Sequence, residues 1–296
     1  MKIGSVADHR SREGGALVYP VYSRRSGGLS AGVNLFPDHK LCSFDCPYCE
    51  VFPFESSLRF DLEIMKSALR SALNEALENR VEVRDICFSG NGEPTLSADF
   101  RAALEAARII RDELFPAQNT AGLQKTQPAL VVITNGTGLL DDDTFELLRG
   151  AADCASGPAN GLSIWLKLDA ATEAWYRAVN RSPVNFAALI AAIKRFAQSG
   201  APFILQTMIC LVERKLPPPE EESAWIDLVT ELAALSHARR TADGGLRGVH
   251  LYGKARPAPE DPRCEKAPGE VLLRRADLAR TALSKANLPA RVEVFE

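Results

Sequence analysis

Three cysteines lie within a segment of eight residues. Cys42, Cys46 and Cys49 follow a Cys-x3-Cys-x2-Cys spacing in the stretch LCSFDCPYCE. Thiolates this close together reach one metal centre without help from distant parts of the chain, and thiolates hold iron–sulfur clusters. Three protein ligands leave one position of the metal centre open, which a catalytic site needs and a structural site avoids. The segment therefore predicts one metal centre held by three thiolates.

A zinc site is the alternative. His39 precedes Cys42 by three positions and, with the three cysteines, would complete a closed Cys3His tetrahedron. Structural zinc ligands usually come as two separated pairs, a pattern that this segment lacks. With zinc, or with a saturated iron–sulfur cluster, the protein would be a non-catalytic metal or electron-transfer protein.

The cysteine segment carries an aromatic residue, Tyr48, just before its third cysteine. It resembles the CxxxCxΦC signature of the radical S-adenosylmethionine (radical SAM) superfamily. The resemblance implies that the three cysteines bind a 4Fe-4S cluster whose open iron is chelated by S-adenosylmethionine. It also implies reductive cleavage of S-adenosylmethionine to methionine and a 5′-deoxyadenosyl radical, which abstracts hydrogen from a substrate.

Further segments match the same superfamily. Gly92, Glu93 and Pro94 resemble its GGE motif, in which Glu93 and nearby backbone would hold the amino group of S-adenosylmethionine. Lys167 and Asp169 alternate on an apolar predicted strand and so face the same side. By resemblance they would contact the carboxylate and ribose of S-adenosylmethionine, and the alternative is a Lys–Asp pair that fills the interior of a barrel. Weaker candidates for cofactor binding, each with a turn or core role as the alternative, are Asn135, Gln206 and Tyr252.

The resemblance extends over residues 17–295. The stretches VYSRRSGGLSAGVNLFP, FSGNGEPTLS, KLDA with NRS after it, and LYGKARPAPED resemble uncharacterised radical SAM proteins related to the wyosine-base synthases that modify tRNA. The chain lacks the additional N-terminal cysteines and the flavodoxin-like domain of those synthases. Their reaction therefore does not carry over, and a tRNA-base modifier remains an alternative function.

Strand-like apolar runs alternate with amphipathic helical patterns along most of the chain, which is typical of βα units around a parallel sheet. The predicted strands are 32–36, 85–90, 129–136, 162–170, 202–210, 248–253 and 291–295. The predicted helices are 61–80, 97–115 with Ser97 as N-cap, 142–148, one from about 173, 184–198, 219–236 and 271–286. Six such units predict an α/β, single-domain partial (β/α)6 TIM-like barrel over 31–296 with a C-terminal extension, preceded by an N-terminal extension over 1–30. A doubly wound open sheet is the alternative.

The motifs follow the predicted strands, at the carboxyl ends where barrels place their active sites. Net charge is −3, from 35 Lys and Arg against 38 Asp and Glu, which argues against a broad basic surface for nucleic acid. No apolar stretch is long enough to span a membrane and no apolar signal segment opens the chain. We therefore expect a cytoplasmic protein without a membrane partner.

Four cysteines stand apart from the segment: Cys87, Cys154, Cys210 and Cys264. A cytosolic chain is not expected to use them as a disulfide framework, and they are too dispersed to predict an auxiliary cluster. Cys264 lies in a polar, Pro-rich stretch and is expected to be the most exposed of the four.

The motifs do not identify the substrate. Arginine recognises carboxylates and phosphates well, and five arginines flank the motifs: Arg24, Arg25, Arg177, Arg181 and Arg256. The densest cations near the expected mouth are Arg24 with Arg25 and the segment 254–256, enough for one anionic group. We therefore expect a small-molecule or peptide substrate and a reductant such as flavodoxin or ferredoxin, with tRNA as the less favoured partner.

Overall fold

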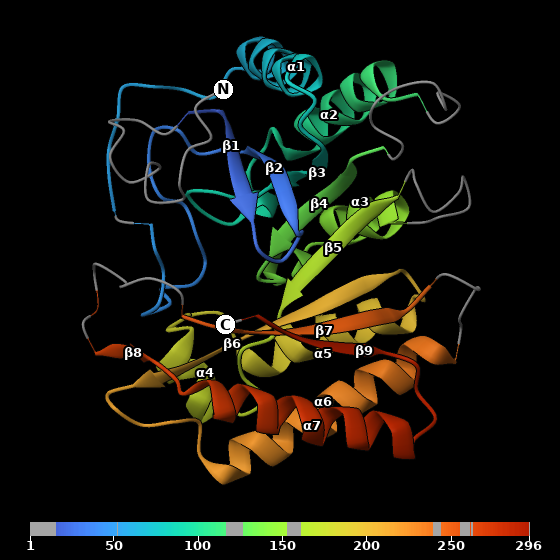
Figure 1. The fold of residues 1–296 in the computed structure, drawn as a ribbon. Helices are drawn as coiled ribbons and strands as arrows, with labels where there is room; N and C mark the ends of the chain where they lie inside the picture. Colours follow the sequence, from blue (N-terminus) through green and yellow to red (C-terminus); the bar gives the residue numbers. More distant parts are fainter. Residues whose placement is uncertain are drawn as a thin grey trace. The chain divides into compact units, whose positions relative to one another are not determined.

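The computed structural model describes residues 16–51, 53–116, 127–152, 161–238, 244–254, 261 and 263–295 (Figure 1). These residues divide into two compact units. The first unit comprises the described parts of 1–42, 51–133 and 154–163. The second comprises those of 43–50, 134–153 and 164–296. All six predicted βα units are present among the described residues.

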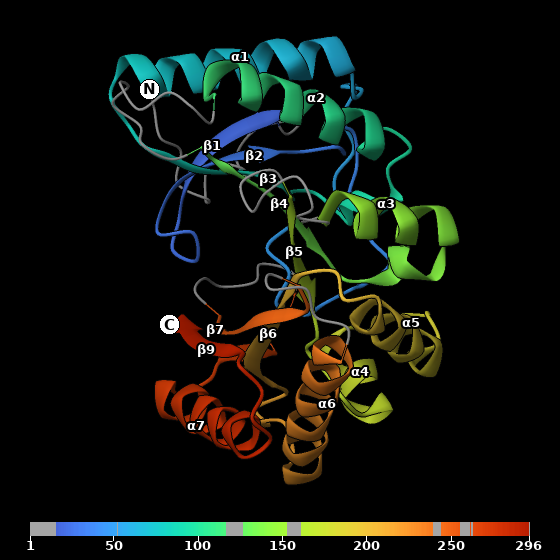
Figure 2. The ribbon, with the colours of Figure 1, turned by 90° about the vertical axis from the view of Figure 1, so that its right-hand side faces the viewer.

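The first unit is a sheet covered by two helices. Its strands run in the order β1 (Val18–Ser23), β2 (Gly28–Val33), β3 (Val83–Phe88) and β4 (Ala129–Thr134). β1 is antiparallel to β2, and β2, β3 and β4 are parallel. Helices α1 (Leu62–Glu78) and α2 (Phe100–Leu114) lie side by side on the sheet (Figure 2). They bury the apolar stripe that their helical periodicity predicts.

The start of this sheet differs from the sequence prediction. The first predicted strand, 32–36, is wrong in its bounds, because β2 already ends at Val33. Asn34 ends it by accepting a hydrogen bond from Phe36 N at 3.1 Å through its side-chain oxygen, a turn that competes with strand pairing. β1 was not predicted. It contains Pro20, which suits an edge strand but weakens the strand pattern.

The second unit is a parallel sheet with helices packed on it. β5 (Leu162–Lys167), β6 (Phe203–Val212), β7 (Leu246–Gly253) and β9 (Arg291–Phe295) pair in that order, and β8 (Cys264–Lys266) pairs antiparallel with β6. The helices are α3 (Asp142–Ala152), α4 (Glu173–Val179), α5 (Phe186–Gln198), α6 (Pro219–His237) and α7 (Gly269–Lys285). α6 and α7 pack against each other and against β7 (Figure 1).

Two helix predictions need correction. The N-cap residue of α2 is Asp99 rather than Ser97, and the Asp99 side chain makes no capping hydrogen bond. Ser97 instead ends the short 3-10 helix Pro94–Leu96, and its hydroxyl accepts a hydrogen bond from Asp99 N at 3.2 Å. α3 continues to Ala152, beyond the predicted end at 148. The predicted helix 61–80 and the last predicted strand match α1 and β9 closely.

The prediction for Cys264 is wrong, because its residue exposure is 2%. The Pro-rich stretch forms β8 there, and Cys264 lies opposite Val212 of β6. Cys154 and Arg256 lie outside the described residues. Within the part of the chain that is described, no helix has both the length and the apolar character required to cross a membrane. The division at residue 30 stays a prediction, although β2 runs across it.

Candidate functional site

The cysteine segment forms a tight turn at its carboxyl end, where Cys49 N donates to Cys46 O at 2.9 Å. All three cysteines are partly exposed, and none is in a disulfide in the described chain. Burial, opposed in part by the Lys167 ammonium, raises the pKa of the Cys46 thiol to about 12. A thiolate at this position is therefore unfavourable unless a bound cation stabilises it.

A polar network in the second unit joins Tyr48 of this segment to the end of β5. The Tyr48 hydroxyl donates to Asp169 Oδ2. The Lys167 Nζ lies 3.2 Å from the same oxygen and donates to the Tyr252 hydroxyl at 2.7 Å. Asp169 Oδ1 also accepts from Met208 N at 2.9 Å. Four of the predicted site residues therefore lie in direct contact, contributed by the cysteine segment, β5 with the loop that follows it, and β7.

The network keeps Lys167 charged. Burial alone would lower the pKa of Lys167, but the Asp169 carboxylate and the Tyr252 hydroxyl outweigh it and raise this pKa well above its usual range. The ammonium also lies over two aromatic rings, 4.9 Å from the centre of the Tyr48 ring and 5.4 Å from that of Tyr252. A fixed cation beside the cysteine segment suits recognition of an anionic group.

Asn180 belongs to this network, and sequence reasoning did not single it out. It caps the carboxyl end of α4 and is 2% exposed. Its Nδ2 lies 3.6 Å from Cys46 Sγ and 2.9 Å from Asp169 Oδ2. The backbone oxygen of Asn180 accepts from Asp45 N at 2.9 Å. The only sequence signal was the short stretch NRS after KLDA.

The first unit joins the other predicted motif to the beginning of the cysteine segment. Leu41, which precedes Cys42, donates its N–H to Asn91 O at 3.2 Å and accepts from Glu93 N at 2.8 Å. A Cβ at Gly92 would stand 1.9 Å from Leu41 O, a distance that real Cβ atoms do not show. Glycine is therefore required where the two backbones meet.

The Glu93 side chain is 2% exposed and caps the 3-10 helix that Pro94 begins. Its Oε1 accepts from Thr95 N at 3.2 Å and from Thr95 Oγ1 at 2.7 Å. These bonds fix the carboxylate beside the backbone that pairs with Leu41. Its contact with a bound cofactor stays a prediction.

The two other candidates have different surroundings. Asn135 accepts from Thr137 N at 3.0 Å and donates to Ser43 Oγ at 2.9 Å, so it combines a turn with a contact to the cysteine segment. Gln206 is fully buried opposite Lys167 in the register of β5 and β6. Its Nε2 lies 3.5 Å from His250 Nδ1. These contacts fit the core role that was the alternative for Gln206.

The predicted cations differ in their exposure and surroundings. Arg177 pairs with Glu173 on the surface of α4, and Arg181 Nη1 lies 2.6 Å from Asp261 Oδ2. Arg24 is exposed and Arg25 is half-buried. Lys254 is not a surface cation as expected, because it is 8% exposed and its ammonium donates to Cys264 O.

The donor chemistry fits an iron–sulfur cluster, since three cysteines on one short segment provide the thiolates that such clusters need. Among the described residues, no group of three or more His, Cys, Asp or Glu is arranged to hold a metal ion. His39, the fourth ligand of the zinc alternative, has its Nδ1 3.0 Å from Asp38 Oδ1, and its side chain is 47% exposed.

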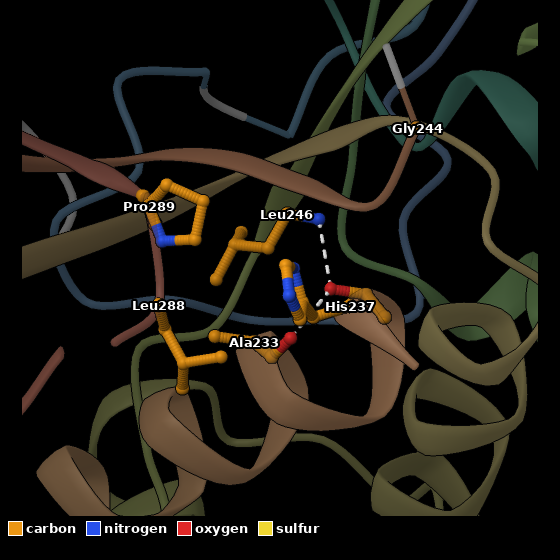
Figure 3. Close-up of a pocket in the computed structure, with 8 residues that line it drawn as sticks. Ala233, His237, Gly244, Leu246, Leu288 and Pro289 are labelled. Carbon is orange, nitrogen blue, oxygen red and sulfur yellow. Dashed lines mark hydrogen bonds between the residues drawn. The ribbon is translucent and has the colours of Figure 1, made fainter. Parts of the chain in front are cut away.

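A small pocket of the second unit lies apart from these residues in the sequence (Figure 3). Its lining includes His237, Leu246 and Pro289, and its volume is about 10 Å³, which is room for about one water molecule. Leu246 N donates to Ser236 Oγ at its wall. None of the candidate site residues lines it.

Comparison with known sequences gives short matches. No protein-family model matches the chain. A stretch of 78 residues is 40% identical to a UPF0026 protein of Helicobacter pylori strain 26695, covering 26% of this chain and 25% of that protein. A stretch of 95 residues is 36% identical to the GTPase Obg of Brachyspira hyodysenteriae, covering 31% of this chain and 14% of that protein. The matches thus span a quarter or less of these relatives.

Solved structures match over most of the chain. SuiB from Streptococcus suis, bound to S-adenosylmethionine, gives a TM-score of 0.60 at 13% identity, covering 89% of this chain and half of that one. TYW1 with a lysine-pyruvate adduct bound gives a TM-score of 0.54 at 12% identity, covering 85% of this chain and 73% of that one. A mutant spore photoproduct lyase with a dinucleoside spore photoproduct gives a TM-score of 0.57 at 14% identity, covering 93% of this chain and 78% of that one.

Likeness to these structures confirms the predicted partial barrel. The network around Lys167 lies in the second unit, and the backbone pairing of Leu41 with the Gly92 motif lies in the first. The chain therefore shares the fold of SuiB, TYW1 and spore photoproduct lyase.

Proposed function

We propose that this protein is a radical SAM enzyme in which Cys42, Cys46 and Cys49 hold a 4Fe-4S cluster. When bound and reduced by an external one-electron donor, the cluster would pass that electron to S-adenosylmethionine, which would give methionine and a 5′-deoxyadenosyl radical able to take a hydrogen atom from the substrate. The donor set and the fold shared with SuiB bound to S-adenosylmethionine support this assignment.

The backbone pairing between Leu41 and the Gly92–Glu93 motif carries the proposal. It joins the residue before the first cysteine to a motif about 50 positions further along the chain, within the first unit. A structural zinc segment has no need of such a partner. A catalytic centre needs it, because the open position must be faced by groups that bind the second reactant.

The chain's own residues have distinct tasks in this proposal. Glu93 and the backbone beside it bind the amino group of S-adenosylmethionine. Lys167 is held in place by Asp169 and Tyr252 and provides the positive charge that binds the carboxylate of S-adenosylmethionine. Tyr48 and Asp169 keep the cysteine segment against the end of β5. Asn135, Gln206, Gly92 and Pro94 shape the surrounding backbone and core.

The substrate in this proposal is a small or peptide-sized anion. The net charge of −3 and the few exposed cations among the described candidates disfavour a long polyanion. SuiB bound to the precursor peptide SuiA gives a TM-score of 0.60, which supports a peptide. A reductant such as flavodoxin or ferredoxin and a cytoplasmic location complete the proposal.

A tRNA substrate is the second candidate, favoured by the likeness to TYW1. Binding of tRNA at micromolar concentration with a steep salt dependence, lost in the Arg24→Ala/Arg25→Ala double variant, would replace the small anion by RNA. Binding that is weak and unchanged in that variant is the result expected here.

The test of the function is product formation under anaerobic conditions. Reconstituted protein is incubated with S-adenosylmethionine and dithionite, and 5′-deoxyadenosine is measured by mass spectrometry. We expect 5′-deoxyadenosine only with the reductant present, and more of it when the lysate fraction that contains the substrate is added. Stoichiometric zinc, no iron and no 5′-deoxyadenosine would establish the non-catalytic zinc protein instead.

A further inference from the structure

We propose that Asn180 is a positioning residue for the cluster ligand Cys46, to whose sulfur it donates an amide N–H. The effect of Asn180 on the reduction potential of the cluster rests on the proposed function. Its contact with Cys46 does not. The stretch NRS that contains Asn180 has no task in the function as proposed so far. Asn180 and the residues to which it is hydrogen-bonded all belong to the second unit.

The orientation of the Asn180 amide follows from its second partner. Asp169 is paired with Lys167 and accepts from Met208 N, so its carboxylate acts as an acceptor. The Asn180 atom that lies 2.9 Å from Asp169 Oδ2 must therefore be the nitrogen. The same nitrogen lies 3.6 Å from Cys46 Sγ, and its second hydrogen is the one available to that sulfur.

Tyr48 also lies near Cys46, but it cannot take this task alone. A tyrosine has one O–H, and the hydroxyl of Tyr48 directs it to Asp169 Oδ2. The Asn180 amide has two N–H groups and serves the carboxylate and the sulfur together. Asn180 is thus a direct link between a proposed cluster ligand and the Lys167 network.

The backbone around Asn180 is built to hold it in place. Its carbonyl accepts from Asp45 N at 2.9 Å, and the Ser182 hydroxyl donates to Ser43 O at 2.7 Å. Both bonds fasten the residues just before Cys46. Between them, Arg181 has a φ of +48°, a left-handed conformation that a side-chain-bearing residue rarely adopts.

Arg181 keeps this conformation while its guanidinium pairs with the buried Asp261, 2.6 Å away. Strained backbone persists only where the surrounding contacts over-determine it. The turn at Arg181 aims Asn180 and Ser182 at the same segment, which a regular helical continuation of α4 would not do. The strain is therefore associated with fixing the cysteine segment.

A hydrogen bond to a ligand sulfur stabilises the reduced, more negative form of an iron–sulfur cluster and raises its reduction potential. Loss of the bond should also loosen the ligand, as the loss of outer-shell partners of metal ligands generally does. Asn180→Ala removes the donor. Asn180→Asp removes it and places a second carboxylate beside Asp169.

The first arm of the test uses cluster-free protein and needs no cofactor. Reduced protein is treated with N-ethylmaleimide, and alkylation of each cysteine is followed by peptide mass spectrometry. In Asn180→Ala we expect Cys46 to react about tenfold more slowly than in the unaltered protein, because the thiolate that is alkylated loses its N–H donor, with Cys49 changed much less. Ser182→Ala is the matched control, because it loosens the segment without touching the thiol. Equal reactivity of Cys46 in Asn180→Ala and the unaltered protein would overturn the contact.

The second arm measures the reduction potential of reconstituted protein by EPR-monitored titration. We expect Asn180→Ala to shift the equilibrium about tenfold toward the oxidised form, equivalent to 59 mV for a one-electron couple. Asn180→Asp should shift it further in that direction, and Ser182→Ala should leave it unchanged. A potential that is the same in all four proteins would refute the redox role. Failure of the unaltered protein to bind a cluster would refute the proposed function, while the alkylation arm would still decide the position of Asn180.

Discussion

Tyr48 and Asp169, separated by 121 positions in the sequence, are joined by a hydrogen bond from the phenol to the carboxylate. Burial and the Asp169 charge raise the pKa of Tyr48 well above its usual range, so the phenol keeps its proton. The bond fastens the aromatic residue before the third cysteine to the end of β5. The fold thereby places the short cysteine segment against a charged network.

Gly92→Ala is expected to break the pairing with Leu41, because the new Cβ would overlap Leu41 O. We expect a loss of about 1–3 kcal/mol in the free energy of unfolding and a lower iron content after reconstitution. Denaturant titration and iron analysis measure the two effects.

Gly150→Ala is the control for that substitution. Gly150 is exposed in α3, with nothing within 4 Å of the position of its Cβ. Alanine there should stabilise the protein by about 0.5–1 kcal/mol. If Gly92→Ala were as stable and as rich in iron as the unaltered protein, the backbone pairing would have no importance for the site.

Lys167→Ala is expected to weaken the binding of S-adenosylmethionine by about 1.5–3 kcal/mol, because a charge-assisted hydrogen bond is lost. Tyr252→Phe removes one neutral partner but keeps the ion pair with Asp169, so its effect should be smaller, about 0.5–1.5 kcal/mol. Anaerobic calorimetry with cluster-loaded protein measures both. Unchanged affinity in Lys167→Ala would show that the ion pair serves only the interior of the fold.

Glu93→Ala is expected to keep the cluster while weakening the binding of S-adenosylmethionine about tenfold or more, because its ammonium loses a carboxylate partner. Iron content and affinity are measured on the same sample. The Glu93 carboxylate also caps a short 3-10 helix, so the unfolding midpoint is recorded as well. Full affinity in a folded variant would place the amino group elsewhere.

Asp261 should make the stability of the protein depend on pH. Its hydrogen bonds from Arg263 and Arg181 hold the pKa of this carboxyl well below its usual range. A lowered folded-state pKa stabilises the protein above the unfolded-state value of about 4. This contribution is lost as pH falls below that value toward the folded-state pKa.

Asp261→Asn should therefore cost about 1.5–3 kcal/mol at pH 7, and its difference from the unaltered protein should shrink below about pH 4. Asp277→Asn, which breaks an exposed pair with Arg280, should cost less than about 1 kcal/mol. Urea unfolding at several pH values gives the comparison. An Asp261→Asn deficit that stayed constant with pH would show that its charge is not the cause.

Much of the fold follows from periodicity. The apolar spacing of 61–80 corresponds to α1, whose buried residues include Met65, Leu69 and Leu73. Short or irregular elements could not be predicted from periodicity, because β8 has three residues and β1 contains a proline. The burial of Cys264 depends on pairing with β6, which a polar, Pro-rich stretch does not reveal.

The site was predictable where residue type and strand position coincide. Lys167 ends β5 and Asp169 lies two positions beyond it, and buried charges so close need each other. Asn180 was not predictable, because an asparagine after a helix is typical of a helix end. Its role comes from contacts with Cys46 and Asp169, which only the folded chain brings together.

The central claim is that the three cysteines of the segment bind a 4Fe-4S cluster with an open position. The most direct measurement is iron and sulfide analysis with EPR of anaerobically reconstituted Cys46→Ala and Cys87→Ala proteins. Cys87 is a buried cysteine of β3 outside the segment. We predict that Cys87→Ala keeps about four irons per chain and an EPR signal that changes when S-adenosylmethionine is added, whereas Cys46→Ala loses both. A full cluster signal in Cys46→Ala would contradict the assignment.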